Sequence, residues 1–312
     1  MCNTNPHNQL NTPILFLVFN RLDTTKKTFE EIKKTKPLKL YIASDGSRKN
    51  ISNESLIINT VRNYVLDNID WNCEVKTLFH EENLGCKIAV SSAIEWLFSN
   101  EEMGIILEDD CLPSFSFFLF CDNLLKEYKD DSRIMMISGT NLATSWKTKE
   151  NDYFYSRLGT MWGWATWKRA WKEYDEDMKQ WKYVRNSSIY NSMFGSKEEF
   201  KKNTRIYEQT YEGLIDTWDY QWVFARQIHS GLTIVPSRNL ISNIGFGNNA
   251  THTLNKYSTG SNLKRFDLSF PLKINSILVA DNDYDRFLTS KKSYTIKSLL
   301  FALSNKIKNI FN

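Results

Sequence analysis

Apolar strand patterns and helical patterns alternate along roughly the first 140 residues of this 312-residue chain. Short apolar runs, for example PILFLVF at 13–19, LKLYIA at 38–43 and GIIL at 104–107, are each followed by a helical pattern. Apolar strands separated by helices are typical of a mainly parallel sheet that carries helices on both faces. We therefore expect one α/β domain, elaborated by a less regular and aromatic-rich second half.

The composition is that of a globular protein, with 41% hydrophobic and 24% charged residues. A formal net charge of +4 is too small to indicate a nucleic-acid-binding protein, so we predict no nucleic-acid partner. The five cysteines form no C-x-x-C pair, and we interpret them as free thiols of a reducing cytosol. The polar first twelve residues lack the apolar core of a secretion signal, and no apolar run approaches about 20 residues. These features together predict a cytoplasmic protein.

Three acidic residues, Glu108, Asp109 and Asp110, directly follow the apolar run at 104–107. Adjacent carboxylates repel one another, and a divalent cation offsets that cost. Carboxylate oxygens suit Mg²⁺ or Mn²⁺, which in turn bind diphosphate oxygens. A solvated acidic loop is the alternative interpretation. The position after a buried strand favours a site, because ligands of parallel sheets bind beyond the carboxyl ends of strands.

Polar residues also follow the first two predicted strands: Asn20 and Arg21 after the first, Asp45 and Gly46 after the second. Taken alone, each pair is typical of a cap or a turn. Together with the acidic triplet they make a nucleotide pocket plausible, since Arg and Asn hydrogen-bond bases and phosphates. Lys87, near the start of a predicted helix, either meets a phosphate there or lies in solvent. There is no G-x-G-x-x-G or Walker A motif, which disfavours a dehydrogenase or a P-loop enzyme.

The segment at 159–167, GTMWGWATW, combines glycines with tryptophans. Glycine lets the backbone approach a ligand closely, and indole rings stack on sugars. We expect Trp162 and Trp164 to contact a ligand, whereas Trp167 and Trp171 are expected in the core.

The segment LIDTWDYQW at 214–222 places Asp216 and Asp219 three residues apart. On a helix the two would share one face, and a carboxylate in an aromatic setting can act as a general base. The alternative interpretation makes Asp216 an N-cap and Asp219 a surface acid. Trp222 in the same segment is a further ligand candidate. His252, in a polar loop that contains glycines, is a candidate metal or phosphate ligand.

The last 23 residues, 290–312, contain five lysines and no acidic residue, and their apolar residues recur at helical spacing. Such a basic amphipathic helix either lies on an anionic membrane surface or packs on its own domain.

In this order, these segments resemble the nucleotide-sugar glycosyltransferases of the GT-A fold, most closely the N-acetylglucosaminyltransferase I type and its bacterial relatives. The resemblance covers roughly residues 13–255. The segments that carry it are Asn20-Arg21, Ser44-Asp45-Gly46, Asn83 to Lys87, Glu108 to Pro113, Gly163-Trp164 and Trp218-Asp219. The acidic triplet, followed by a proline and an aromatic helix, is its most specific part.

The resemblance implies metal-dependent, inverting transfer of a sugar from a nucleoside diphosphate donor, UDP-linked by expectation, to a glycan or lipid-linked glycan. Asp219 would be the general base, but the family's Trp-Asp-Asp-Trp appears here as Trp218-Asp219-Tyr220-Gln221-Trp222. The second acid is therefore missing, and Asp216 remains a competitor for the base. The residues expected to bind the nucleotide sugar are Asn20, Arg21, Asp45, Gly46, Lys87, Glu108 and Asp109. Trp162, Trp164 and Trp222 would bind the acceptor, and Asp110 and His252 would hold Mn²⁺ or Mg²⁺.

We thus expect a flexible N-terminus at 1–12, a transferase domain at 13–289 with a nucleotide-binding half (13–140) and an acceptor-side half (141–289), and the basic helix at 290–312. A composition rich in Lys, Asn and Ile, together with that helix, suggests bacterial surface polysaccharide assembly at the inner face of the membrane. Two alternatives remain. One is a non-catalytic carbohydrate-binding protein; the other is a sugar-nucleotide pyrophosphorylase, whose expected Gly-rich loop is absent here.

Overall fold

The computed structural model describes residues 9–194, 197–246 and 260–289. The predictions for His252, for the basic helix at 290–312 and for most of the N-terminal segment therefore lie outside the described residues. The strands are β1 (Ile14–Val18), β2 (Lys39–Ser44), β3 (Glu74–Phe79), β4 (Met103–Glu108), β5 (Cys111–Pro113), β6 (Ile134–Ser138), β7 (Tyr153–Ser156), β8 (Trp164–Trp167), β9 (Leu232–Pro236) and β10 (Ile241–Asn243). The helices are α1 (Leu22–Thr35), α2 (Glu54–Asp67), α3 (Gly85–Asn100), α4 (Phe115–Glu127), α5 (Lys168–Trp171), α6 (Trp181–Val184), α7 (Ser188–Ser192), α8 (Lys197–Tyr211), α9 (Asp219–Ile228) and α10 (Asn282–Thr289).

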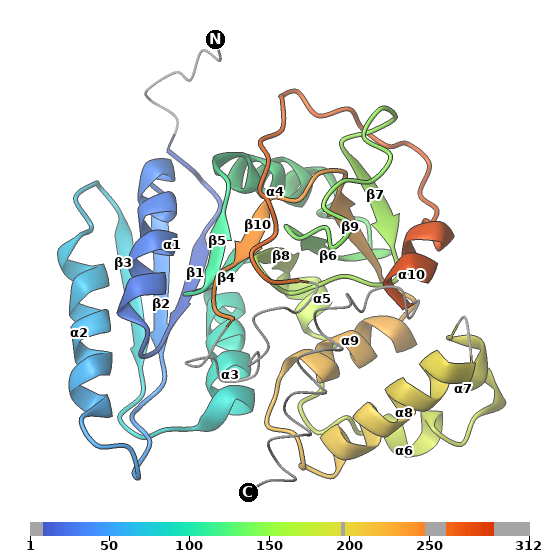
Figure 1. Ribbon diagram of the computed structural model, residues 1–312, viewed down its shortest axis with the longest axis horizontal. Helices are drawn as coiled ribbons and strands as arrows, with labels where there is room; N and C mark the ends of the chain where they lie inside the picture. Colours follow the sequence, from blue (N-terminus) through green and yellow to red (C-terminus); the bar gives the residue numbers. More distant parts are fainter. Residues whose placement is uncertain (1–8, 195–196, 247–259, 290–312) are drawn as a thin grey trace, which may run out of the picture.

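Eight strands form one central sheet in the order β3-β2-β1-β4-β8-β6-β9-β7 (Figure 1). Six of them run in the same direction, while β8 and β7 are antiparallel to their neighbours. All five residues of β1 are buried, as the continuous apolar run predicts for a strand covered on both faces. The observed sheet confirms the predicted α/β class with a mainly parallel sheet.

Side chains alternate between the two faces of the sheet. Ile14 and Phe16 of β1 join a core with α1, α2 and α4, whereas Leu15 and Leu17 join a second core with α3, α5 and α9. Helices therefore cover both faces. A third aromatic cluster, centred on Trp181, binds α6, α7 and α8 to the outer side of α9. Figure 1 shows these three helices gathered beside α9, away from α1 and α2.

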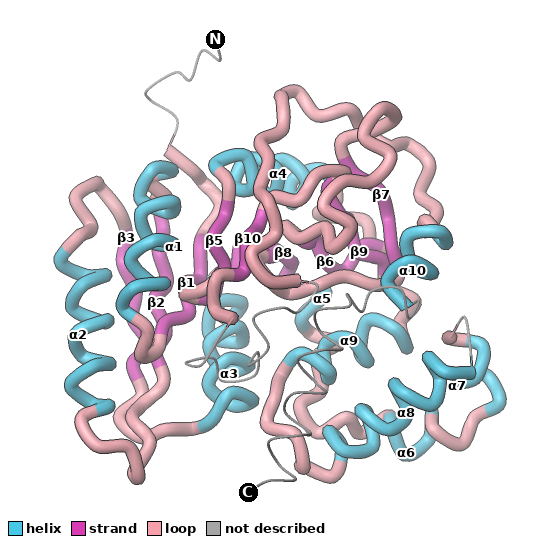
Figure 2. The backbone as a smooth tube through the Cα atoms, in the orientation of Figure 1, coloured by secondary structure: helices cyan, strands magenta, loops and turns pink. Residues whose placement is uncertain are grey.

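The parallel register brings three strand ends to one place. Val18 pairs with Ser44 of β2, and Leu17 pairs with Glu108 of β4. The short ribbon of β5 and β10 lies next to this edge, as Figure 2 shows, and Ile244 donates its N–H to the carbonyl of Asp110. Pro113 ends β5 and α4 begins at Phe115, so the aromatic helix that follows the acidic triplet starts two residues after its proline.

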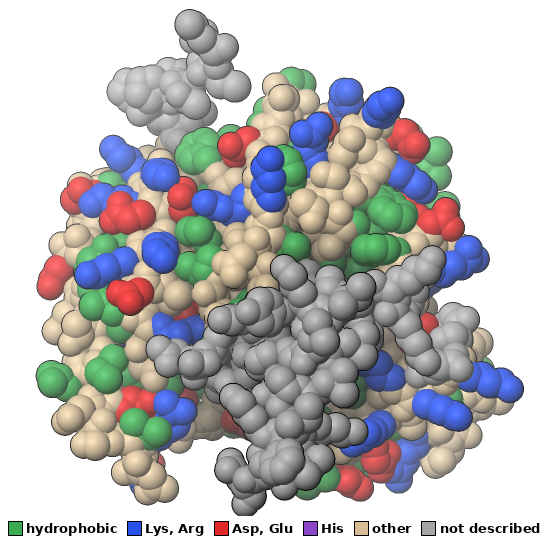
Figure 3. Space-filling view, viewed as in Figure 1, with side chains coloured by type: hydrophobic (Ala, Val, Ile, Leu, Met, Phe, Trp, Pro, Cys, Tyr) green, Lys and Arg blue, Asp and Glu red, His purple; other side chains and the backbone are tan. Residues whose placement is uncertain are grey.

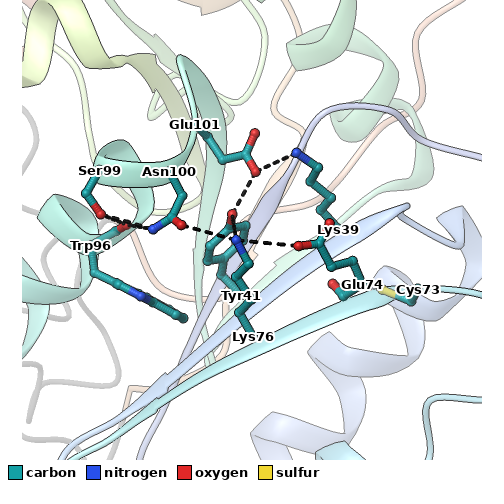
Figure 4. Close-up of polar contacts among 9 residues, drawn as sticks. All are labelled: Lys39, Tyr41, Cys73, Glu74, Lys76, Trp96, Ser99, Asn100 and Glu101. Atoms are coloured by element: carbon teal, nitrogen blue, oxygen red, sulfur yellow. Dashed lines mark hydrogen bonds and ion pairs between the residues drawn. The ribbon is translucent and has the colours of Figure 1, made fainter.

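A polar cluster at the opposite, amino-terminal edge of the sheet is fully connected (Figure 4). Glu101 accepts hydrogen bonds from Lys39 and Tyr41, each at 2.7 Å, and Asn100 accepts one from Lys76 at 3.1 Å. Burial, followed by the contact with Glu101, raises the pKa of Tyr41. Because these polar groups supply one another's hydrogen-bond partners, we interpret the cluster as structural: it links β2 and β3 to the end of α3.

Over the part of the surface in Figure 3 that the described residues form, acidic and basic side chains are interspersed, so no field of one sign covers that face. None of the helices in the described ranges has both the length and the apolar character needed to cross a bilayer. Cys73, Cys86, Cys111 and Cys121 are free thiols.

Candidate active site

Arg21 and the acidic triplet form an ion-paired cluster at the carboxyl edge. The Arg21 guanidinium donates to Asp110 Oδ2 at 2.8 Å and also pairs closely with Asp109 Oδ1. The side chains of Asp109 and Asp110 are 3% and 9% exposed, so both carboxylates are largely shielded from solvent. Sequence reasoning placed all three residues at one site but did not foresee that Arg21 would be the direct partner of both carboxylates.

The cluster retains negative charge that Arg21 does not balance. Burial, and then the charge of Asp110, raises the pKa of Glu108. Burial also raises the pKa of Asp109, although Arg21 opposes that shift. Asp109 Oδ2 is buried and has no hydrogen-bond partner among the described residues. The site is therefore suited to a further cation or to a ligand that carries one.

Asp45 holds the turn that leads into α3. Its carboxylate accepts hydrogen bonds from the N–H groups of Leu84 at 2.9 Å and Gly85 at 3.1 Å, and from the Asn83 amide at 2.8 Å. Gly46 packs so tightly that an added Cβ would lie 2.4 Å from the backbone of Glu82. In this structure both predicted nucleotide-binding residues therefore shape the loop around the site.

Asn20 and Lys87 are likewise engaged with other protein groups. Asn20 donates to the buried Glu54 carboxylate at 2.8 Å, which also binds Arg48. The Lys87 ammonium lies 3.6 Å from Glu176. Lys87 is at the first turn of α3, as predicted, while Asn20 supports the loop after β2.

Asp216 caps α3 from a distant part of the chain. Its carboxylate accepts the N–H groups of Cys86 at 3.0 Å and Lys87 at 2.9 Å, which are free at a helix start. Helix α9 begins only at Asp219, so the expectation that Asp216 and Asp219 share a helix face was wrong. Asp216 is an N-cap, but of α3.

Removing this cap gives a direct stability prediction. Asp216→Ala leaves two N–H groups of α3 without their acceptor, so we expect the free energy of unfolding to fall by about 1 kcal/mol. Urea unfolding followed by circular dichroism measures the change. Asp23→Ala is the matched control, because Asp23 is exposed in the first turn of α1 and makes no side-chain hydrogen bond among the described residues. Equal stability of the two variants would contradict the capping role.

Asp219 has one free carboxylate oxygen. Oδ1 accepts the N–H of Tyr220 at 2.9 Å and a close hydrogen bond from the Thr217 hydroxyl. Within the described residues Oδ2 has no partner, so it is available to accept a proton. Burial, followed by the charges of Glu108, Asp216, Asp219 and Asp45, raises the pKa of Cys86, which lies among these acids. Asp45, after β2, and Asp216, before α9, both accept backbone N–H groups at the start of α3, so these two carboxylates meet there.

The tryptophan predictions divide in two. Trp164 and Trp222 are 1% and 0% exposed and pack with Trp218 in the core beneath the sheet, so the structure contradicts their predicted acceptor contacts. The physical reason is that residues 164–167 form strand β8, which lies between β4 and β6 in the sheet. Side chains of a strand alternate between the two faces, and Trp164 lies on the face that packs against α3, α5 and α9. Trp162 is partly buried against Phe246 and remains a ligand candidate.

Gly245 belongs to the site and was not predicted. A Cβ at this position would lie 1.9 Å from Asp110 Oδ2 and 2.7 Å from an Arg21 nitrogen. Its N–H is fixed by the Asn243 side chain at 2.9 Å. The sequence signal was a glycine two residues after the short strand β10, where backbone can approach a polar group closely.

The chemistry of these residues fits a divalent cation, although no ligand cage is preformed. Among the described residues no three His, Cys, Asp or Glu side chains are arranged around one cation position. The fit lies in the uncompensated carboxylates, above all the buried and unpaired Asp109 Oδ2. Asp110, the metal ligand expected from the sequence, and Asp109 Oδ2 are the groups here that would hold such an ion.

No protein-family model matches the chain, and no curated protein matches it. Among solved structures, it is similar to a mannosyltransferase, PcManGT from Pyrobaculum calidifontis in complex with GDP-Man and Mn²⁺, with 12% identity and a TM-score of 0.35 over 52% of this chain and 45% of that one. S. aureus TarS 1–349 has 10% identity and a TM-score of 0.39 over 74% and 59%. A UDP-glucose pyrophosphorylase complexed with UDP-glucose has 10% identity and a TM-score of 0.36 over 75% and 93%. Because all three TM-scores are below 0.5, we base no functional argument on these similarities.

Proposed function

We propose that this protein is a glycosyltransferase that moves a sugar from a nucleoside diphosphate donor, UDP-linked by expectation, to the hydroxyl group of a glycan or glycolipid acceptor, with inversion. The observation that supports this proposal is the convergence of two kinds of group at one edge. Arg21 and the acidic triplet come from the ends of β1 and β4, and the free oxygen of Asp219 comes from the start of α9.

In this proposal the donor side and the acceptor side have separate residues. Arg21 and Asp110 face the diphosphate, and Asp219 Oδ2 removes the proton of the attacking acceptor hydroxyl. When bound, Mn²⁺ or Mg²⁺ neutralises the diphosphate and so improves it as a leaving group. The N-acetylglucosaminyltransferase I type, the hexosyl or N-acetylhexosaminyl specificity, the membrane-associated location and the role in surface polysaccharide assembly remain predictions.

Six of the eight tryptophans in the second half are too deeply buried to serve the carbohydrate-binding alternative, whereas Trp146 and Trp162 are only partly buried. That interpretation requires indole rings exposed to a glycan, but six tryptophans of residues 141–289 are buried: Trp164, Trp167, Trp171, Trp181, Trp218 and Trp222. They form core, as the sequence predicted for Trp167 and Trp171.

Nucleotide binding tests the donor side. We expect UDP to bind more tightly with Mn²⁺ than with EDTA. Asp110→Ala should reduce this Mn²⁺-dependent gain in UDP affinity at least tenfold, because it removes a carboxylate proposed to hold the cation. Isothermal titration calorimetry with UDP measures both effects. Asp131→Ala, which removes a partly buried acid paired with the exposed Arg133, is the control. Mn²⁺ dependence that persists in Asp110→Ala would count against the metal role, and formation of UTP from UDP-glucose and pyrophosphate would identify a pyrophosphorylase instead.

A further inference from the structure

A cavity of about 480 Å³ lies beside β7, the edge strand of the central sheet. Its outer wall is the segment 273–281, which leads into α10 and passes along the outer side of β7 (Figure 1). Asp152 donates its N–H to the carbonyl of Lys273 at 3.4 Å, and Asp281 donates its N–H to the carbonyl of Tyr155 at 2.8 Å. Between these contacts the segment is longer than the stretch of β7 that it passes, so it bends away from the strand.

The segment carries three aliphatic side chains that are mostly exposed to solvent. Ile274, Ile277 and Val279 are 58%, 69% and 65% exposed, and the last two line the cavity. We call these three residues the aliphatic patch. The surrounding sequence PLKINSILVA, at 271–280, contains one lysine and no acid. Single exposed aliphatic residues are common, but three of them within six positions indicate an interaction surface.

A tryptophan and two basic residues lie beside the aliphatic patch. Trp146 lines the same cavity, is partly buried, and donates its Nε1–H to Asp281 Oδ2 at 2.9 Å. Lys147 binds the same carboxylate oxygen at 2.8 Å, and Arg286 lies 3.4 Å from Asp283. Tryptophan next to aliphatic and basic side chains is the combination enriched where proteins meet the headgroup layer of a bilayer.

The cavity itself is too close to neutral to attract an anionic bilayer. Its lining carries two basic and three acidic residues: Lys147, Arg286, Glu150, Asp281 and Asp283. Positive charge is supplied by the sequence that follows α10, since residues 290–312 contain five lysines and no acid. An apolar surface next to a polybasic segment provides the two contributions that stable peripheral membrane binding needs. A surface for another protein would explain the aliphatic side chains but not these lysines.

We propose that the aliphatic patch is a docking surface for an anionic lipid bilayer. The three side chains enter the headgroup layer, while the lysines of 290–312 are attracted to the lipid charges. The inference goes beyond the proposed function and does not depend on it, because the patch lies beside β7 rather than at the ends of β1 and β4. It assigns a described part of the fold to a membrane contact that the sequence of 290–312 predicts only as one of two alternatives.

Co-sedimentation of the full chain with lipid vesicles tests the surface. The anionic vesicles contain phosphatidylcholine and phosphatidylglycerol in a two-to-one ratio, and vesicles of phosphatidylcholine alone are the neutral comparison. We expect the wild-type protein to bind the anionic vesicles. Ile277→Ser/Val279→Ser should weaken that binding about tenfold or more, because two aliphatic side chains no longer gain free energy on leaving water.

Leu56→Ser/Ile57→Ser is the matched control. Leu56 and Ile57 are also exposed, at 69% and 44%, but they lie on α2, at the opposite end of the molecule from α10 (Figure 1). Vesicle binding by this variant should equal that of the wild type. A third variant, with the five lysines of 290–312 replaced by glutamine, should bind anionic vesicles about tenfold or more weakly and lose the salt dependence of binding.

The Tm of Ile277→Ser/Val279→Ser shows whether the chain itself covers the patch. We expect it to stay within about 3 °C of the wild type, since substitutions of solvent-exposed side chains change stability little. A larger fall would show that the protein packs on these residues, and it would overturn the proposal. A dimer in sedimentation equilibrium without lipid, abolished by the same variant, would overturn it in favour of a second copy of the chain.

Absence of binding to the anionic vesicles, or equal binding by Ile277→Ser/Val279→Ser and the wild type, would also overturn the docking surface. UDP titration of the same samples keeps this proposal apart from the proposed function. Loss of vesicle binding with unchanged UDP binding is expected for the patch variant, whereas vesicle binding by a protein that binds no UDP would sustain the surface and reject the transferase.

Discussion

Asp219→Asn is expected to lower the rate of sugar transfer by about 10²–10⁴-fold while UDP binding stays within twofold of the wild type. General-base assistance contributes rate enhancements of this size. The variant tests the base cleanly, because an asparagine Oδ1 can still accept the hydrogen bonds from Thr217 and Tyr220. Only Oδ2, the oxygen without a partner among the described residues, changes to an amide that cannot take a proton. Steady-state kinetics with a UDP-sugar, together with UDP calorimetry, measures both quantities.

Asp216→Asn is the control that settles which acid is the base. Asp216 uses both carboxylate oxygens to cap α3, so the variant should lose stability and only a small part of its activity. The reverse pattern, an active Asp219→Asn and an inactive Asp216→Asn of native stability, would reassign the base to Asp216.

The part of the site that lies directly after strands could be predicted from sequence. Continuous apolar runs mark buried parallel strands, and the carboxyl ends of such strands meet at one edge. Arg21 and the triplet at 108–110 needed only this rule, and the structure brings Arg21 within hydrogen-bond distance of Asp109 and Asp110. The aromatic helix after Pro113 could be predicted in the same way, apart from its first turn.

The rest depends on contacts between residues far apart in the sequence. Nothing local indicates that Asp216 caps a helix 130 positions earlier, or that Gly245 lies against Asp110. The pattern WGWATW has glycines and indoles typical of a ligand loop, but pairing with β4 and β6 makes it a central strand and buries Trp164. Burial is decided by which strand neighbours which, and a single sequence does not contain that information.

Arg21 decides whether the acidic triplet can be buried at all. Three adjacent acids at the end of a strand repel one another, and two of them are almost inaccessible to water. A buried carboxylate that loses its partner is much more costly than an exposed one, because desolvation is no longer offset. The guanidinium spans Asp109 and Asp110 together, so a single substitution would leave both of them unpaired.

Arg21→Met should therefore lower the free energy of unfolding by about 3–5 kcal/mol, measured by urea denaturation. Lys33→Met, which breaks a partly exposed ion pair between α1 and Asp70, should cost under about 1 kcal/mol. Converting Asp109 and Asp110 to asparagine in the Arg21→Met background should restore at least half of the loss, since no unpaired charge then remains. Failure of that rescue would show that Arg21 acts through its packing.

The same series separates the structural role of Arg21 from its proposed role in donor binding. UDP at about 100 times its Kd should stabilise the wild type by about 2.7 kcal/mol, by mass action. If Arg21 also contacts the diphosphate, the triple variant should gain much less from UDP than the Asp109→Asn/Asp110→Asn double variant that keeps Arg21, since both of these proteins lack the carboxylate proposed to hold the cation. An equal gain in both proteins would confine Arg21 to balancing the carboxylates, and the diphosphate would then need a different cation.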